Sequence, residues 1–454
     1  MTTVRFENLA AGGEAVGRDE SGRAVFAPRA APGDVAEIAL EKQSKTFARG
    51  RVLQILQPSP HRVIAPCPYF HDDTKTSCGG CAWQHVSHDA QIAAKRALVR
   101  DALQRLGGVA DAEELVAPCV PSPRAFAYRN KADFVAAQNG ELQVLGFFAP
   151  DSHCAIDVAR CLIQENGNNA ILAAAREALA LGLVAPFDAA SGRGVLRRLV
   201  ARTSSSGQSL VCAVTSRVHW PQERAFAEHM RRAVPSLVGV LRREPQRDAR
   251  LIGDGNLSRD WLEETVGDLR LRVSGEGFFQ VNAALVETLA ETALRLANVQ
   301  REEKILDLFC GVGLFSLALA KCGARVVGIE RSASAVRDAK SNAALNGLEA
   351  EFLAGDAAGE MRRLAARGET FSCIFLDPPR AGAAECLPAI LQLMPRRIVY
   401  VSCDPATLAR DVKTLSGEYV LRAAVPLDLF PQTAHVETVA LLEQDGTSLS
   451  RALK

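Results

Sequence analysis

The C-terminal part of the chain, from about residue 270, alternates between short apolar runs and longer amphipathic segments. Apolar runs of this length suit buried strands, and the segments between them are long enough for helices. Strands that are joined through helices run parallel in one sheet, with helices on its two faces. We therefore predict a doubly wound, Rossmann-like α/β domain over residues 269–454 that closes on a C-terminal hairpin. The expected strands are Lys304–Phe309, Arg325–Ile329, Ala350–Leu353, Cys373–Leu376, Ile398–Val401, Tyr419–Pro426 and Val436–Leu442, and the expected helices include Ala283–Ala297, Leu314–Lys321 and Ser334–Asn346.

Several of these strands end in polar or reactive residues. The sequences at their ends are Asp307–Gly313, Glu330, Asp356, Asp377-Pro378-Pro379-Arg380 and Ser402-Cys403-Asp404-Pro405. In an open α/β sheet the carboxyl ends of the parallel strands meet at one edge, and ligands bind there. Packing alone does not account for so many such groups at one edge. We therefore expect a ligand site and a reaction centre in the C-terminal domain.

The glycine-containing turn Asp307–Gly313 is typical of a nucleotide-like ligand. Glu330 ends the next strand, where an acidic residue commonly binds a ribose diol. The full G-x-G-x-x-G motif is absent, since Phe309 and Ser316 stand at its first and last glycine positions. This favours a ligand without a pyrophosphate, such as S-adenosylmethionine, over a dinucleotide. Asp356 is placed either to bind an adenine amino group or to cap the following helix.

Cys403 and Glu437 are candidates for chemistry. Cys403 follows the apolar run Ile398–Val401, and Pro405 prevents the strand from continuing. We expect Cys403 directly before a helix, whose N-terminus would favour a thiolate. Its alternative is a small buried apolar residue, the commoner fate of a free cysteine. Glu437 stands just before the last strand, and its alternative is an exposed carboxylate at the sheet edge.

Residues 1–58 are expected to form a small all-β module. The short β-prone pieces are Thr2–Phe6, Ala24–Ala27, Asp34–Leu40 and Phe47–Leu56. They are separated by turn sequences rich in Gly, Pro and charged residues. Five short strands in such a length suit a barrel of the OB type, which often binds oligonucleotides. The basic residues Lys42, Lys45, Arg49 and Arg51 near its last strands form either an RNA-binding patch or an ordinary solvated face.

A cysteine motif follows this module. Cys78 and Cys81 form C-x₂-C across two glycines, and Cys67 precedes them by eleven positions. The best candidate for a fourth ligand is Cys161, ahead of Cys154 and Cys119. Four thiolates suit either a zinc site or a [4Fe–4S] cluster, and the spacing does not separate these. The remaining alternative is a set of unliganded thiols.

Residues 59–268 read as a mixed α/β domain. We predict a helix over Ser87–Leu106 with Lys95 on its polar side, and strands at Gly194–Thr203, Ser209–Thr215 and Leu237–Arg243. The sequence Tyr128-Arg129-Asn130-Lys131 opens a further strand and suggests either contact with RNA or an exposed strand edge. A basic RNA-binding face is also expected from paired or nearly paired arginines, namely Arg197, Arg198, Arg202, Arg231, Arg232, Arg242 and Arg243.

Composition excludes several classes of protein. The formal net charge is only +1, so any binding of nucleic acid must come from local patches. Twelve cysteines in 454 residues do not indicate a small disulfide scaffold. No secretory signal opens the sequence, and no apolar run approaches the length of a membrane span. We expect a cytoplasmic protein without a membrane segment or an obligate protein partner.

The sequences DLFCGVG, DPPRAG, YVSCDP and HVET together resemble the S-adenosylmethionine-dependent RNA uracil-5-methyltransferases, and the likeness covers the whole chain. The segment Gly275–Asn282 also resembles this family's entry to its class I methyltransferase domain. The resemblance implies that residues 1–58 are an RNA-binding TRAM domain and that the methyl donor is contacted by Gln280, Phe309, Glu330, Asp356 and Asp377. It also implies a [4Fe–4S] cluster, with zinc as the less favoured occupant, bound by Cys67, Cys78, Cys81 and Cys161.

The chemistry of uracil agrees with this resemblance. Its C5 is a poor nucleophile until a thiolate adds at C6, and a base must then remove the C5 proton. Cys403 is expected as the nucleophile and Glu437 as the base; Cys310, the rival thiol, sits where the donor should crowd it. The target base must leave its stack to reach such a pocket. The TRAM module and the four cysteines favour 23S ribosomal RNA as the substrate, with tRNA as the alternative.

Two other classes of function compete with this reading. An RNA-binding protein with a vestigial methyltransferase fold would not need Glu330, Cys403 and Glu437 together. A redox iron–sulfur protein is the third possibility, but no other part of the sequence suggests electron transfer. We therefore expect the cluster to be structural and the chain to be an RNA uracil-C5 methyltransferase.

Overall fold

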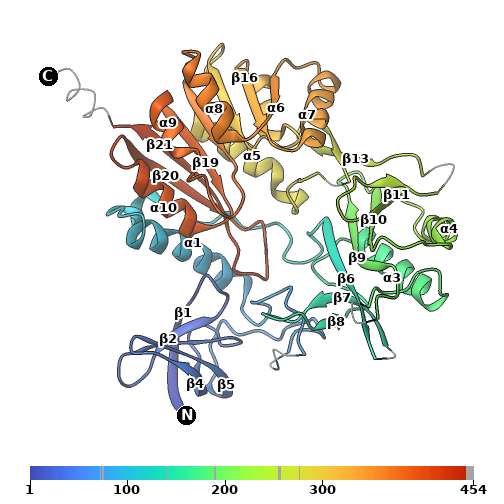
Figure 1. Cartoon of the computed structure of the whole chain (residues 1–454). Helices are drawn as coiled ribbons and strands as arrows, with labels where there is room; N and C mark the ends of the chain where they lie inside the picture. Colours follow the sequence, from blue (N-terminus) through green and yellow to red (C-terminus); the bar gives the residue numbers. More distant parts are fainter. Residues whose placement is uncertain are drawn as a thin grey trace. The chain divides into compact units, whose positions relative to one another are not determined.

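A computed structural model describes residues 1–71, 73, 76–140, 142–188, 191–253, 257–275 and 277–445 of the chain (Figure 1). The structure divides into two compact units. The first unit comprises Met1–Asp73, Gly80–Ala125 and Ser372–Lys454, and the second comprises Thr74–Gly79 and Phe126–Phe371. Glu276 of the segment Gly275–Asn282 lies outside the described residues.

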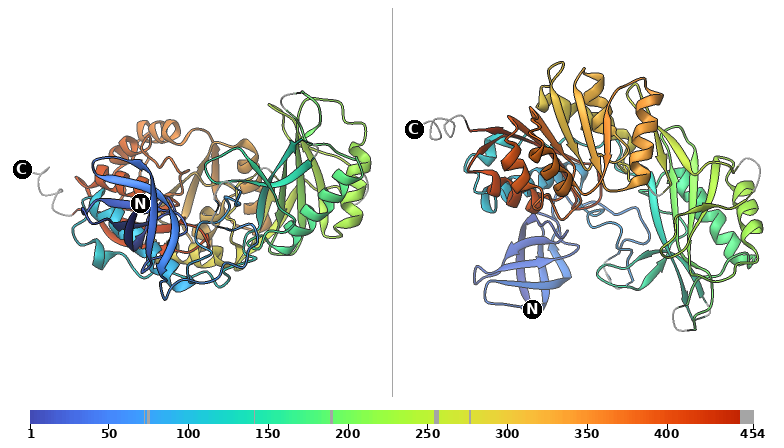
Figure 2. Two further views of the ribbon diagram at one scale, coloured as in Figure 1. Left: turned by 90° about the horizontal axis from the view of Figure 1, so that it is seen from below. Right: turned by 45° about the horizontal axis from the view of Figure 1, so that its top comes forward.

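The first unit begins with a closed five-stranded barrel, drawn in dark blue in Figure 2. Its strands are β1 (Thr2–Leu9), β2 (Ala15–Arg18), β3 (Ala24–Ala27), β4 (Val35–Gln43) and β5 (Phe47–Gln57), in the order β1-β2-β3-β5-β4. Alternate side chains of β1, such as Val4 and Phe6, are buried inside it. The prediction of a small OB-like barrel of five strands is confirmed, although β2 was not among the β-prone pieces named from the sequence.

A long helix follows, α1 (His88–Arg105), with the short α2 (Ala112–Leu115) after it. The predicted helix is confirmed, but the expected polar position of Lys95 is wrong, because its side chain is fully buried. Lys95 Nζ forms an ion pair with Asp428 and donates a hydrogen bond to Phe430 O at 2.9 Å. A buried ammonium is tolerated when it is paired in this way. A second element therefore covers the face of α1 that the sequence pattern assigned to solvent.

The C-terminal strands of the first unit carry several predicted site residues. They are β18 (Cys373–Leu376), β19 (Arg397–Ser402), β20 (Tyr419–Leu427) and β21 (Glu437–Gln444), accompanied by α9 (Leu387–Leu393) and α10 (Pro405–Leu415). β18 and β19 are parallel, whereas β21 lies between β19 and β20 and is antiparallel to both. The predicted closing hairpin is confirmed.

The second unit contains a seven-stranded sheet in the order β12-β11-β10-β9-β6-β7-β8. The strands are β6 (Lys131–Asn139), β7 (Leu142–Phe148), β8 (Ala155–Asp157), β9 (Leu196–Thr203), β10 (Ser209–Thr215), β11 (Leu237–Arg243) and β12 (Arg250–Leu251), with helices α3 (Asn166–Ala180) and α4 (Glu223–Ala233). The predicted basic face is partly wrong, because Arg202 and Arg242 are buried. Arg242 pairs internally with Glu223. Tyr128 is also buried and is not free to stack on RNA.

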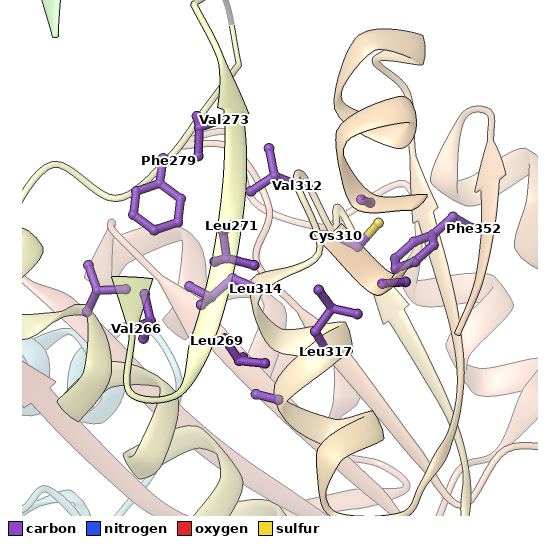
Figure 3. Packing of buried hydrophobic residues seen from close by; sticks show 14 of the residues in the cluster. Val266, Leu269, Leu271, Val273, Phe279, Cys310, Val312, Leu314, Leu317 and Phe352 are labelled. Carbon is purple, nitrogen blue, oxygen red and sulfur yellow. The ribbon is translucent and has the colours of Figure 1, made fainter. Parts of the chain in front are cut away.

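The rest of the second unit alternates strands and helices as predicted. The hairpin β13 (Trp261–Val266) and β14 (Leu269–Ser274) leads to α5 (Ala283–Ala297), β15 (Lys304–Leu308), α6 (Leu314–Lys321), β16 (Arg325–Glu330), α7 (Ala333–Leu345), β17 (Glu351–Ala354) and α8 (Ala357–Ala366). β15, β16 and β17 are parallel neighbours. Side chains of the hairpin pack on α5, α6 and α7 in one hydrophobic core, part of which is shown in Figure 3. The parallel strands place the turn after β15 beside the end of β16.

In the part of the chain that the structure describes, no helix is long and apolar enough to cross a membrane.

Candidate active site

The turn between β15 and α6 has an unusual backbone. Phe309, Gly311 and Gly313 all have positive φ angles, of 63°, 54° and 91°. A bulky residue in this region costs about 1–3 kcal/mol, so the surrounding structure must hold Phe309 there. At Gly313 a Cβ atom would lie 3.3 Å from both Ala339 and the Phe352 ring, which leaves little room for a side chain. The turn therefore presents backbone groups closely at the carboxyl end of β15.

Glu330 is tied to this turn. Its Oε2 accepts a hydrogen bond from Gly311 N at 3.2 Å, and its Oε1 accepts one from Ser332 N at 2.7 Å. A carboxylate has about four acceptor sites, so it can hold these bonds and still accept from a ligand hydroxyl. Glu330 is thus oriented beside the turn, as a ribose-binding acid would be.

Asp307 is a buried carboxyl group at the same turn. Ser316 donates a hydrogen bond to its Oδ2, while no donor in the described residues reaches its buried Oδ1. Burial raises the pKa of Asp307 to about 7, because the charged form is poorly solvated there. An acceptor buried without a partner is costly, so this oxygen is suited to a ligand that brings a donor.

Asp356 and Gln280 have structural contacts. Asp356 Oδ2 accepts from Gly359 N at 2.9 Å and caps α8, so the helix-cap alternative for this residue is confirmed. Its predicted contact with the donor stays a prediction. Gln280 is buried, and its backbone oxygen accepts from Asn130 Nδ2 at 3.1 Å. Gln280 thus lies between β14 and α5, at a point anchored to the start of β6.

Cys310 is poorly suited to be a nucleophile. It is buried in the hydrophobic core beside Phe352, as Figure 3 shows. A Cβ atom on the neighbouring Gly328 would meet its sulfur at 3.0 Å, so the thiol packs closely against β16. Burial, followed by the charges of Asp307 and Glu330, raises the pKa of Cys310 far above its usual value. This thiol stays protonated and inaccessible.

Cys403 occupies the position that the sequence predicted, between β19 and α10. Asp404 caps the helix, because its Oδ1 accepts from Ala406 N and Thr407 N, each at 2.9 Å. Pro405 stands in the first helical turn, where its missing N–H costs nothing. Cys403 is half-buried, unlike Cys310. The thiol is therefore held at the end of a core strand, where it is partly accessible to solvent.

The expected preference of Cys403 for the thiolate is wrong, because its pKa is raised and not lowered. The pKa of Cys403 is raised to about 11, first by burial and then by the nearby Glu437. Asp377 and Asp404 raise it further, and Arg380 is the cation that opposes them. Burial and three acids outweigh the helix N-terminus. The resting thiol is protonated.

Glu437 is buried, and the alternative of an exposed edge carboxylate is wrong. It is the first residue of β21 and only 2% exposed. Ser402 pairs with Thr438 across β19 and β21, so Cys403, which directly follows β19, comes next to Glu437. Burial raises the pKa of Glu437 well above its usual value; Asp377 adds to this, and Arg380 acts against it. A thiol and a carboxyl group of perturbed pKa thus lie side by side.

His435 belongs to the sequence motif HVET, but the sequence predicted no role for it. Arg380 Nη2 lies 3.2 Å from His435 Nε2. Both side chains are exposed, next to the buried Glu437. The short distance along the chain from His435 to Glu437 was the signal available in the sequence.

The four predicted cluster ligands are all half-buried, whereas Cys119 is buried and Cys154 is exposed. The backbone near two of them is held firmly: Gly79 N donates to Phe148 O at 2.9 Å, and Asn169 bonds both the N–H and the C=O of Cys161. Among the described residues, however, no group of three or more His, Cys, Asp or Glu side chains could hold a metal ion. The cluster stays a prediction.

Comparisons with known proteins are consistent with this site. Residues 247–445 match the family described as tRNA (Uracil-5-)-methyltransferase, and residues 2–53 match the TRAM domain. An uncharacterized RNA methyltransferase of Halalkalibacterium halodurans is 36% identical over 452 residues, which cover 98% of this chain and 97% of that protein. One of Gloeobacter violaceus is 38% identical over 451 residues, 97% of this chain and 96% of that protein.

The chain belongs to the RNA uracil-5-methyltransferase family.

A solved structure supports the same assignment for the methyltransferase fold. The tRNA (uracil-54, C5)-methyltransferase of Pyrococcus abyssi, in complex with S-adenosyl-L-homocysteine, has a TM-score of 0.74 and 26% identity, covering 97% of this chain and 99% of its own. The protein is thus an S-adenosylmethionine-dependent RNA (uracil-5) methyltransferase with an N-terminal TRAM domain. The orphaned Asp307 Oδ1 and the oriented Glu330 fit a ligand that carries hydroxyl and ammonium donors.

Proposed function

We propose that this methyltransferase modifies C5 of a specific uridine in 23S ribosomal RNA, with Cys403 as the covalent nucleophile and Glu437 as the base. The observation that carries the proposal is that Cys403 directly follows β19 while Glu437 opens the adjacent strand β21. A half-buried thiol and a fully buried carboxyl group are thereby placed together. Uracil-C5 methylation requires a nucleophile that adds at C6 and a base that removes the C5 proton.

In the proposed first step the sulfur of Cys403 bonds to C6 of uracil. The thiol proton passes to solvent, which reaches the half-buried Cys403, and the electrons of the C5=C6 bond move toward C5 and O4. The raised pKa of Cys403 means that the free thiolate is rare, so attack is coupled to binding of the base. Arg380 supports this step, since its charge is the one that stabilises the thiolate.

When bound, S-adenosylmethionine supplies the methyl group that C5 takes up. We propose that Gln280, Phe309, Glu330, Asp356 and Asp377 hold it. The support is strongest for Glu330, which is already oriented beside the turn of Phe309. It is weakest for Asp356, whose Oδ2 is engaged in the helix cap.

In the last step Glu437 removes the proton from C5. The C5–H electrons re-form the C5=C6 bond, the bond from C6 to sulfur breaks, and Cys403 leaves as a thiolate. Glu437 must be ionised to act, although its burial favours the protonated form. Buried carboxylates are strong bases once deprotonated, because water does not stabilise their charge.

The substrate is proposed to be 23S ribosomal RNA rather than tRNA. The support is the combination of the TRAM domain over residues 1–58 with a central domain, 59–268, that carries four spaced cysteines. We propose a structural [4Fe–4S] cluster on Cys67, Cys78, Cys81 and Cys161, with zinc as the less favoured occupant. The tRNA alternative is favoured by the P. abyssi relative, which acts on tRNA.

One experiment tests substrate and activity together. 5-Methyluridine is mapped in ribosomal and transfer RNA from a strain that lacks this protein, and again after complementation with the wild type or Cys403→Ala. Loss of one 23S modification, restored only by the wild type, is the expected result. Loss in tRNA alone would select the alternative substrate, and an unchanged map would overturn the proposal.

A further inference from the structure

His435 and Arg380 form a hydrogen bond whose direction is determined. Arg380 Nη2 and His435 Nε2 lie 3.2 Å apart. A guanidinium has five donors and no acceptor, so the histidine nitrogen must accept. His435 is therefore the neutral imidazole with its proton on Nδ1. A protonated ring could not accept this bond, and its positive charge would be repelled by the guanidinium.

The position of His435 is itself determined by the loop between β20 and β21. Its backbone N–H donates to Thr433 Oγ1 at 3.2 Å, and that hydroxyl donates to Phe430 O at 2.7 Å. The rings of Phe430 and His435 meet edge to face, with centroids 6.0 Å apart. The same carbonyl of Phe430 accepts from the buried Lys95. An internal ion pair thus anchors the loop that carries His435.

Arg380 has no comparable anchor of its own among the described contacts. It follows the rigid Asp377-Pro378-Pro379 bend, but its side chain is exposed. An exposed arginine samples many rotamers and loses side-chain entropy when one of them is selected. The bond to His435 restricts this freedom and ties the guanidinium to a residue two positions before Glu437. Histidine can do this without adding a negative charge to a site that already holds several.

We propose that His435 is a positioning residue that holds the Arg380 guanidinium beside Cys403 and Glu437. This inference rests on the proposed function, since it assigns His435 a part in activating the nucleophile. The charged groups that face the thiol are Glu437 from β21, Asp377 from the bend after β18 and Asp404 at the start of α10, and Arg380 opposes all three. If Arg380 moves away, no positive charge opposes the three carboxylates. The pKa of Cys403 then rises further, and the thiolate becomes rarer.

The test measures the reactivity of Cys403 directly. Wild type, His435→Ala and His435→Gln are treated with limiting iodoacetamide from about pH 7 to pH 10, and labelling of the Cys403 peptide is followed by mass spectrometry. His435→Ala should slow the alkylation of Cys403 by about three- to tenfold and shift its pH profile upward. His435→Gln should stay close to the wild type, because its amide oxygen can accept from Arg380.

Control measurements separate this role from a general loss of structure. S-Adenosylmethionine affinity and the thermal midpoint should be unchanged in both variants. His219→Ala removes another exposed histidine and should leave the alkylation of Cys403 unaltered. A wild-type pH profile in His435→Ala would overturn the inference, as would equal slowing in folded His435→Gln. The assay needs neither RNA nor donor, so its outcome is independent of whether Cys403→Ala abolishes methylation.

Discussion

Cys403 and Glu437 lie opposite each other, one position beyond the Ser402–Thr438 pair of β19 and β21. An antiparallel pair brings facing side chains to within about 4.5–5.5 Å at Cβ. The proposed nucleophile directly follows β19 and the proposed base opens β21, so the register of these two strands brings the residues close together.

Replacement of Cys403 by Ala is expected to abolish turnover and any covalent RNA adduct. The sulfur forms the proposed bond to C6, and no other group in the site can replace it. The measurement is methyl transfer to RNA together with a denaturing gel for the adduct. Cys322→Ala is a matched control, since Cys322 is an exposed thiol at the end of α6 and should be dispensable. Full activity of the Cys403 variant would exclude covalent catalysis by this residue.

The Glu437→Gln variant should accumulate the covalent adduct instead of releasing methylated RNA. Addition at C6 and methylation at C5 remain possible, whereas removal of the C5 proton does not. A slow band that contains both protein and RNA should appear on a denaturing gel when S-adenosylmethionine is supplied. The band should be missing from the double variant that also lacks Cys403. Normal release by Glu437→Gln would remove Glu437 from its proposed role.

The burial of Glu437 also predicts a dependence of stability on pH. Its pKa is raised in the folded protein, so folding retains a proton that the unfolded chain loses above about pH 4.3. This residue's contribution to stability should therefore fall as pH rises from that value through its folded pKa. Glu437→Gln should be the more stable protein at pH 8, by about 1–3 kcal/mol. Urea unfolding at pH 5 and pH 8 measures this difference, which should nearly vanish at the lower pH.

Lys95→Met should destabilise the first unit strongly. The substitution leaves Asp428 buried without its ammonium partner, and breaking such a pair costs about 3–5 kcal/mol. His88 Nε2 lies 2.8 Å from Asp428 Oδ2 and remains as a hydrogen-bond partner, which can offset part of this loss. Chemical denaturation measures the effect, and Arg105→Met, on an exposed side chain of the same helix, is the control. A loss below about 1 kcal/mol would show that His88 alone satisfies Asp428.

The proposed iron–sulfur cluster predicts a particular order of defects. Cys78→Ala and Cys81→Ala should lower bound iron and sulfide and the absorption near roughly 400 nm in anaerobically purified protein. A structural cluster should affect folding or RNA binding before it affects the affinity for S-adenosylmethionine. Cys154→Ala is the matched control on an exposed thiol. Stoichiometric zinc without iron in the wild type would show that the four cysteines bind zinc and not an iron–sulfur cluster.

The sequence alone was sufficient for the order of elements around the site. The apolar run before Ser402 specifies the end of the strand, and the amphipathic segment after Pro405 specifies the helix. Asp404 and Pro405 specify the start of that helix, because a capping acid and a proline act on their own neighbours. The same holds for the turn after β15 and for the small barrel, whose strands are marked by turn residues. The motif pattern also led to the right family, since these local features stand at strand ends.

Only the tertiary structure decided which charges are buried. Lys95 was expected away from the apolar stripe of its helix, and an exposed carboxylate was the alternative for Glu437, yet each side chain is almost inaccessible. Arg202 and Arg242 were expected on a basic face and are inside. Burial depends on what another segment, distant in sequence, places over a residue, and periodicity within one segment carries no information about that partner. For the same reason the raised pKa of Cys403 could not be predicted, since it depends on Glu437, Asp377 and Arg380 from other elements.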